Sequence, residues 1–322
     1  MLRTPARGRA SLNVGERGQQ AAGAAHMTAF AAMVLIATTF PVGDMITDAV
    51  EPAVLQSLRF VMASLIFAPF VIARVGLPWP GLSGLARYGA IAAAMDVFFW
   101  TMYEGLRTTD SLNTAVISTT IPGFTAIFSA ILLHERLGWH RLGALLLGML
   151  GSAWVIFRGS PERLLALELH YGDVLFLAGC VAMGLYATLV RYFHRGEPVM
   201  RMSFWIMALS GFWFLLAANI ELGRTDYGGV APGVWGGIVW LAVGPTVITF
   251  FMIQGATLKI GATRVQVYSY FIPVFVIALD WALGRGLPPL LTLPGVAIVM
   301  LASVVIQRGH IGLAPGHAGG KA

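Results

Sequence analysis

A single acid, Asp96, lies in the otherwise apolar stretch IAAAMDVFFW at residues 91–100. A carboxylate that is kept away from water can pair with a cation, bind a substrate amine or carry a proton, or accept a hydrogen bond from a neighbouring helix. Arg59 is the candidate cation. Desolvation favours the protonated form of Asp96, whereas a nearby Arg59 favours its charged form, so the residue types alone leave all three roles open.

Aromatic and neutral polar residues accompany Asp96. On a helix Trp100 follows Asp96 by one turn and Tyr103 by two, so both share its side. An apolar and aromatic cavity with few polar groups suits a small amphipathic metabolite better than an ion or a sugar. With residues of later segments, the candidate substrate-binding set is Asp96, Trp100, Tyr103, Ser118, Pro122, Thr246, Gln266, Ser269, Tyr270 and Pro273.

Metal, nucleotide and enzyme motifs do not fit this chain. His134 and His140 in HERLGWH are six residues apart, whereas a helical zinc-protease pair needs a spacing of four. Cys180 is the single cysteine, so no disulfide forms within the chain. We find no phosphate-binding Gly-Lys-Ser/Thr loop and expect no metal, no cofactor and no enzymatic activity.

The elements that must position these residues are membrane helices. Hydrophobic residues make up 57% of the 322-residue chain and charged residues only 11%, with a mean hydropathy of +0.76. Soluble proteins usually carry about 25% charged residues. Ten apolar runs are long enough to span a bilayer: 27–46, 53–75, 85–106, 111–133, 140–157, 174–193, 202–220, 233–256, 264–284 and 290–307.

The 21 Lys and Arg residues alternate between the two sides of these spans. Fifteen fall on the side of the termini, and Arg59 lies inside a span. The positive-inside rule therefore predicts both termini in the cytoplasm of a bacterial inner-membrane protein. Because the basic residues are scattered over short loops, we expect contact with anionic lipid and none with nucleic acid. The opposite side carries Arg107, Arg158, Arg163, Arg224 and Arg285.

Residues 1–26 are polar and lack the apolar core of a signal peptide, so we expect a disordered tail there. Met27 opens the first span and is an alternative start. The predicted domains are a first five-helix repeat at 27–157, a second at 172–307, and a cytoplasmic tail at 308–322.

Two sets of five spans cross an odd number of times, so the second set enters from the opposite side and the repeats are inverted. An offset of about 151 residues matches Ser118 with Ser269 and Pro122 with Pro273. A proline inside a helix frees the carbonyl four residues earlier. The matched prolines therefore predict two kinked helices at the repeat interface, with free carbonyls at Ser118 and Ser269.

Depth along the spans restricts the partners of the intramembrane charges. Asp96 lies about 15 Å from either end of its span, too deep to reach water. Arg59 lies roughly 9 Å deep, between the depths of Asp96 and Glu104, so it can reach either acid. Glu104 itself is near the surface, where interfacial solvation also accounts for it. With an offset of 150, Asp96 matches Thr246, so the acid is not repeated.

The segments LRF at 58–60, GLRTTDSLNTAVISTTIPGFTAIFSAILLHERLGWHRLGALLLGMLGSAWVI at 105–156 and GATLKIGATRVQVYSYFIPVFVIALDWALG at 255–284 resemble the EamA-type transporters of the drug/metabolite transporter superfamily. The resemblance covers most of 27–307. It implies ten helices in two inverted repeats, a central cavity and export of metabolites such as amino acids. The position matching Glu135 in the second half is Gly286, which departs from the family pattern.

We therefore expect an all-α integral membrane protein that exports small organic metabolites such as amino acids by alternating access, with protons as a candidate coupling ion. An uncoupled facilitative carrier and a non-transporting membrane sensor are the alternatives. Substrate identity, direction and oligomeric state are not encoded in recognisable motifs.

Overall fold

The ten predicted apolar segments all coincide with helices. The computed structural model describes residues 7–135, 138–157, 159–162, 170–287 and 289–308, and within these ranges the regular structure is entirely helical. Eight helical stretches there are long and apolar enough to cross a membrane, and two shorter apolar stretches lie at Leu142–Val155 and Leu290–Ala302. The chain is therefore an all-helical, multi-pass membrane protein.

The first half of the chain contains seven α-helices and one 3-10 segment among its described residues. In chain order they are α1 (Arg7–Ala37), α2 (Thr39–Ile46), α3 (Pro52–Val75), α4 (Gly81–Gly105), α5 (Ser111–Ile117), η1 (Ser118–Thr120), α6 (Ile121–Leu132) and α7 (Trp139–Ile156).

The second half begins at α9 and is interrupted more often. Its elements are α9 (Tyr171–Phe193), α10 (Val199–Ala217), α11 (Asn219–Arg224), α12 (Pro232–Ala242), the π-helical η2 (Val243–Ile248), α13 (Thr249–Ile260), α14 (Ala262–Gln266), the 3-10 segment η3 (Val267–Phe271), α15 (Ile272–Ala282), η4 (Leu290–Thr292) and α16 (Leu293–Arg308).

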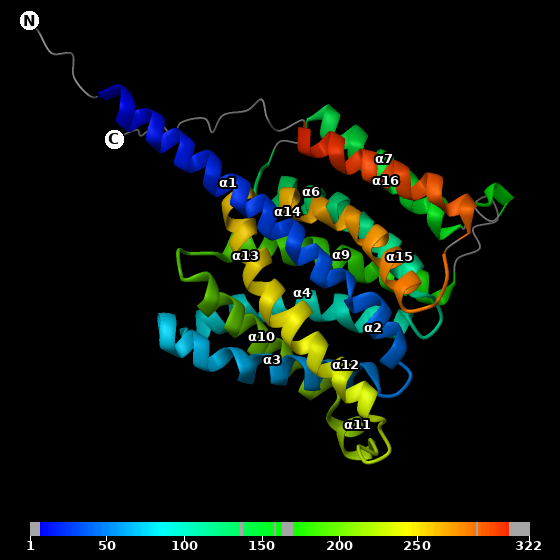
Figure 1. Cartoon of the computed structure of the whole chain (residues 1–322). Helices are drawn as coiled ribbons and strands as arrows, with labels where there is room; N and C mark the ends of the chain where they lie inside the picture. The colour runs from blue at the N-terminus through cyan, green and yellow to red at the C-terminus, as the bar shows by residue number, and fades with distance from the viewer. Residues whose placement is uncertain (1–6, 136–137, 158, 163–169, 288, 309–322) are drawn as a thin grey trace, which may run out of the picture.

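Part of the segment 1–26, for which the sequence predicts a disordered tail, is described here as helix. Helix α1 begins at Arg7, twenty residues before Met27, and Figure 1 shows it extending beyond the bundle. No proline lies between Pro5 and Pro41. Once a membrane span has nucleated a helix, each further residue adds a hydrogen bond at little cost, so the helix continues into the polar segment. Residues 1–6 and 309–322 lie outside the described residues.

Both predicted kinks are present, as a change of helix type. The 3-10 segment η1 comes directly before Pro122, and η3 comes directly before Pro273. The expectation of free carbonyls is wrong, however. Ile121 N–H donates to Ser118 O, and Ile272 N–H donates to Ser269 O. In a 3-10 turn the N–H group three residues after a carbonyl donates to it, so the residue before each proline supplies the hydrogen bond that the proline cannot make.

The two halves contact each other through equivalent helices. Helix α3 packs on α10 and α7 on α16, while α5 packs on α15 and α6 on α14, so the two broken helices lie antiparallel. Two further contacts between the halves, α4 with α9 and α1 with α13, occupy equivalent places in the order of the spans. Figure 1 shows the α7–α16 pair on one side of the bundle and the α3–α10 pair on the other.

We call the end of the bundle that carries residues 47–51, 106–110 and 283–287 the basic-poor end. Here α4 and α9 approach so closely that a Cβ on Gly172 would lie 2.4 Å from the carbonyl oxygen of Gly105. Only glycine fits at such a backbone contact. This pair of glycines therefore fixes how the first half meets the second.

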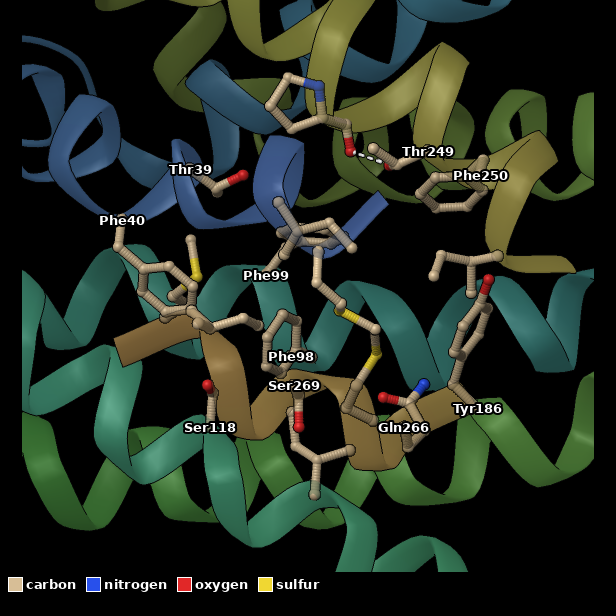
Figure 2. A pocket seen from close by; sticks show the side chains of 18 residues that line it. Thr39, Phe40, Phe98, Phe99, Ser118, Tyr186, Thr249, Phe250, Gln266 and Ser269 are labelled. Atoms are coloured by element: carbon tan, nitrogen blue, oxygen red, sulfur yellow. Dashed lines mark hydrogen bonds between the residues drawn. The ribbon is translucent and has the colours of Figure 1, made fainter. Parts of the chain in front are cut away.

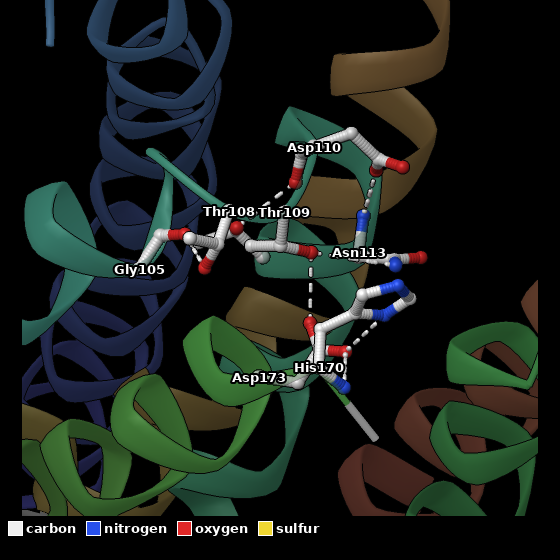
Figure 3. A network of polar contacts seen from close by, with 8 residues as sticks. Gly105, Thr108, Thr109, Asp110, Asn113, His170 and Asp173 are labelled. Carbon is white, nitrogen blue, oxygen red and sulfur yellow. Dashed lines mark hydrogen bonds and ion pairs between the residues drawn. The ribbon is translucent and has the colours of Figure 1, made fainter. Parts of the chain in front are cut away.

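A polar network surrounds this contact (Figure 3). Thr109 Oγ1 donates to the buried Asp173 Oδ1 (2.8 Å), and Asp173 Oδ2 accepts from the backbone N–H of His170 (3.2 Å). Asp110 caps α5 by accepting from Asn113 N–H (2.7 Å). The start of α9 is thus tied to the loop between α4 and α5. We call the two glycines and this network the joint.

The opposite, basic-rich end is tied by Glu197, between α9 and α10. Its carboxylate accepts from Tyr88 Oη (3.0 Å) and from Arg195 N–H (2.8 Å), and it lies 3.8 Å from Arg87 Nη1. The pKa of Glu197 is below its ordinary value: burial of the carboxyl raises the pKa, but hydrogen bonds from backbone N–H groups and from Tyr88 lower it by more.

Candidate functional site

A cavity lies in the middle of the bundle between the two halves. It is lined from the first half by α1, α2, α4, η1 and α6, and from the second by α9, η2, α13, α14, η3 and α15. Its unfilled space amounts to about 680 Å³, including solvent space at its mouth. We call it the mid-bundle cavity.

The described lining residues of this cavity are all uncharged (Figure 2). Aromatic, methionine and branched aliphatic side chains make up most of the lining, which suits an apolar ligand body. The full set is Met33, Ile36, Thr39, Phe40, Phe98, Phe99, Met102, Ser118, Ile121, Met183, Tyr186, Pro245, Thr249, Phe250, Ile253, Gln266, Ser269 and Ile272.

The polar lining groups divide into occupied and available donors. Ser118 Oγ donates to Ala115 O (2.6 Å), and Thr249 Oγ1 donates to Pro245 O (2.6 Å). The buried Ser269 hydroxyl has no partner. Tyr186 Oη accepts from Gln254 Nε2 (3.5 Å), which leaves its own proton available.

Three of the ten predicted substrate-binding residues line the mid-bundle cavity: Ser118, Gln266 and Ser269. The two serines come from the matched 3-10 segments, so the repeat comparison located both. The break before each proline turns its serine toward the interface between the halves.

Asp96 and the two residues predicted to share its side of the helix, Trp100 and Tyr103, do not line the mid-bundle cavity. Helix α4 presents Phe98, Phe99 and Met102 to the cavity, whereas Trp100 is 40% exposed on the outer surface of the bundle. Successive residues of a helix are rotated by about 100° around its axis, so Val97 and Trp100 lie on the side of α4 opposite to the one that faces the cavity. The prediction placed the cavity on the side of the acid, but that side of α4 packs against α10.

Asp96 is buried, and no counter-charge lies beside it in the part of the chain that the structure describes. Its side chain faces Ser210 on α10, and neither carboxylate oxygen nor the Ser210 hydroxyl completes a hydrogen bond. An unpaired charge is costly to keep away from water. Of the three predicted roles, the position of Asp96 suits a contact with a neighbouring helix better than a contact with substrate.

Arg59 does not pair with either predicted acid among the described residues. The guanidinium is fully buried; Nε donates to Thr246 Oγ1 (2.8 Å) and Nη1 to Tyr103 Oη (3.4 Å). Its Cζ lies 4.4 Å from the centre of the Phe99 ring, a cation–π contact. Glu104 instead pairs with Arg107 (3.2 Å) at the surface, as interfacial solvation would allow.

The other predicted residues support the cavity from behind. Thr246, in the π-helical turn of η2, holds Arg59, and the neighbouring Pro245 takes the lining position. Tyr270 packs toward α7, where a Cβ on Gly148 would lie 2.7 Å from its hydroxyl oxygen. Pro122 and Pro273 are buried at the starts of α6 and α15 and do not line the cavity.

Sequence reasoning missed the lining residues of the first and sixth spans. Thr39 and Phe40 follow the break between α1 and α2 at Thr38, and Pro41 comes next. A proline inside an apolar span was a signal that could have located them. Met183 and Tyr186 on α9 carry no comparable signal.

A second cavity, the end cavity, lies at the basic-poor end. Arg285 pairs there with Asp44 on α2 and with Asp280 on α15 (3.5 Å), and Ser111 Oγ donates to Asp280 Oδ2 (2.7 Å). Asp110 also lines it. Since α2 and α5 belong to the first half and α15 to the second, the Asp44–Arg285 ion pair and the Ser111–Asp280 hydrogen bond join the halves at this end.

Comparison with known proteins agrees with this architecture. The model of the EamA-like transporter family matches residues 23–157 and again residues 170–308. The chain therefore belongs to the EamA-like transporter family, as the resemblance in the sequence predicted. Each of the two matches covers one half of the bundle.

Curated relatives and a solved structure are similar over most of the chain. The uncharacterized transporter YyaM of Bacillus subtilis is 22% identical over 85% of this chain and 92% of its own length. The uncharacterized transporter YetK of the same organism is 19% identical over 80% and 78%. A crystal structure covers 90% of this chain and 99% of its own, with a TM-score of 0.69 and 21% identity, and so shares the fold.

Proposed function

We propose that this chain carries small organic metabolites across a bacterial inner membrane by alternating access, in the exporting direction. The observation that carries the proposal is the mid-bundle cavity, which both halves line. A site at the interface between halves, beside interrupted helices, is the arrangement through which many membrane carriers expose a substrate to each side in turn.

Two inverted repeats of five helices are part of this proposal. The antiparallel packing of the broken helices, α5–η1–α6 against α14–η3–α15, supports it, as do the two family matches. Rocking of one half against the other about the 3-10 segments would close the cavity at one end while opening it at the other. The charge count supports placing both termini in the cytoplasm.

The substrate of this cavity is a small amphipathic molecule. Amino acids, which the family resemblance suggests, are one class to test. The lining favours an uncoupled carrier over proton coupling through Asp96, because the lining residues are neutral and Asp96 lies against α10.

The first test is flux from proteoliposomes loaded with a mixture of amino acids and other metabolites, followed by mass spectrometry with and without an imposed pH gradient. Selective loss of one class establishes transport, and its response to the gradient separates coupled from facilitative movement. Binding without movement would identify a sensor and contradict the proposal.

A matched pair of variants ties the flux to the mid-bundle cavity. Ser269→Trp fills the cavity and should lower flux by about tenfold or more, because a bulky ring replaces the space that a substrate needs. Val97→Trp places the same ring on the exposed side of α4, where Val97 is 48% exposed, and should leave flux within about twofold. Equal flux in both variants would place the route elsewhere.

A further inference from the structure

The charges in and behind the lining of the mid-bundle cavity bear on which ligands it can bind. The described lining residues carry no formal charge, yet the buried guanidinium of Arg59 lies directly behind one of them. Arg59 is held against Phe99, itself a lining residue, and Asp96 faces Ser210 on α10. The fold therefore keeps both side chains out of the cavity lining.

Besides Tyr186, two neutral hydrogen-bonding groups that lie close in the chain remain available. Gln266 and Ser269 are one turn apart in α14 and η3, and Figure 2 shows them along the same edge of the cavity. The Gln266 amide offers both a donor and an acceptor, and Ser269 offers a hydroxyl without a partner. A ligand amide or alcohol can satisfy both.

Phe40, Phe99 and Phe250 also line the cavity and lie at the left, centre and upper right of Figure 2, above Gln266 and Ser269 in that view. With the adaptable methionines Met33, Met102 and Met183, these rings can enclose a flat apolar body of varied outline. An ammonium placed here would lose its water without gaining a counter-charge from the lining, and a carboxylate would be separated from the buried Arg59 by the Phe99 ring, so both are unfavourable.

We infer that the mid-bundle cavity selects molecules that carry no net or zwitterionic charge, with a compact apolar body and an amide or alcohol that binds Gln266 and Ser269. This inference rests on the proposed function and names its substrate class. A capped amino acid fits this class, whereas the free amino acid, with two charged ends, does not.

Four probes that share the phenylalanine side chain but differ in charge separate the effect of charge from that of shape. They are N-acetylphenylalanine amide (uncharged), N-acetylphenylalanine (anion), phenylalanine amide (cation) and phenylalanine (zwitterion). Binding to the full chain in nanodiscs is measured by calorimetry at a pH where the carboxylate is ionised and the amine protonated. The uncharged probe should bind about tenfold or more tightly than each charged probe.

Variants of the chain assign this preference to the cavity. Gln266→Leu should weaken binding of the uncharged probe by about tenfold, because the ligand amide loses both hydrogen bonds. Thr101→Val removes a buried hydroxyl outside the lining, one that donates only to carbonyls of α4, and should leave binding unchanged. Ser269→Trp should abolish binding, which distinguishes the cavity from partition of the probe into lipid.

A charge introduced into the lining gives a gain of function. Gln266→Glu should shift preference by about tenfold toward phenylalanine amide, because the cation then meets a carboxylate. Equal or tighter binding of the zwitterion by the natural chain overturns the inference, as does binding of none of the four probes by folded protein.

The same probes separate this inference from the proposed function. One outcome is that phenylalanine flux exceeds the flux in Ser269→Trp proteoliposomes while the natural chain shows no preference for the uncharged probe. That outcome would leave transport standing and overturn the inference. Tight binding of the uncharged probe without flux would support the cavity chemistry and contradict transport.

Discussion

The mid-bundle cavity and the basic-poor end of the bundle use opposite chemistry. The mid-bundle cavity is neutral, lined by rings and methionines, with unpaired hydrogen-bonding groups. The basic-poor end is held by ion pairs through Arg285, by the Asp173 network and by backbone packing at Gly105 and Gly172. The difference fits the roles proposed for the two regions: the end holds the halves together, and the middle binds the ligand.

This division makes a general prediction for variants. Changes at the ends should lower stability and leave ligand preference intact. Changes in the mid-bundle lining should alter ligand preference and leave stability nearly intact. Four substitutions outside the lining test it, each with the free energy of unfolding and probe binding as the two measurements.

The largest effect is expected at the joint. Gly172→Ala places a Cβ 2.4 Å from the Gly105 carbonyl oxygen, where backbone rather than a flexible side chain must move. We expect a loss of about 2–3 kcal/mol in the free energy of unfolding, measured by detergent denaturation. Gly236→Ala in α12 is the control: a Cβ there meets no atom within 4 Å, so the exchange should stabilise by up to about 1 kcal/mol.

A smaller effect is expected in the end cavity. Arg285→Ala removes the cation that both carboxylates share and leaves Asp44 and Asp280 facing each other's charge. Because these side chains are partly exposed, we expect a loss of only about 1 kcal/mol, and the difference should shrink in about 1 M salt. A changed preference among the four probes would contradict the division between end and middle.

The basic-rich end should show a pH dependence through Glu197. The pKa of this residue is lower in the folded chain than its ordinary value, so its stabilisation is present above about pH 4.5 and is lost as pH falls through the lower folded-state pKa. Glu197→Gln should therefore cost about 1 kcal/mol at neutral pH, because charge-assisted hydrogen bonds are weakened. Unfolding curves of the two chains should converge in acid; a constant difference would contradict this assignment.

The smallest effect is expected at Asp96. Asp96→Asn removes a buried carboxylate that has no counter-charge and keeps its shape, so stability should change by less than about 0.5 kcal/mol or rise. Flux and its pH profile should stay within about twofold of the natural chain. A loss of pH dependence in this variant would restore the proton-carrying role of Asp96.

The fold was largely predictable because hydropathy and proline positions act locally. Each apolar run became a helix, and Pro122 and Pro273 marked both 3-10 breaks. The site was less predictable because a helix has several buried faces. The sequence marks Asp96 as unusual but does not say whether its side of α4 meets the cavity or α10, and that choice is made by helix packing.

The partners of Arg59 show the same limit. Depth alone allowed Asp96 or Glu104, yet the guanidinium turns to Thr246 and Tyr103. Both hydroxyls come within reach only when α3, α4 and η2 are packed together. Charge pairing inferred along single helices misses such contacts between neutral groups and a cation.

The joint has a consequence for chain connectivity. Thr109, Asp173 and the two facing glycines set the register of the second half against the first. Because these contacts join α9 to the loop after α4, the peptide link between α7 and α9 is not needed to set that register. The two halves of this transporter, produced as separate polypeptides, should therefore find each other in the membrane and assemble as a heterodimer.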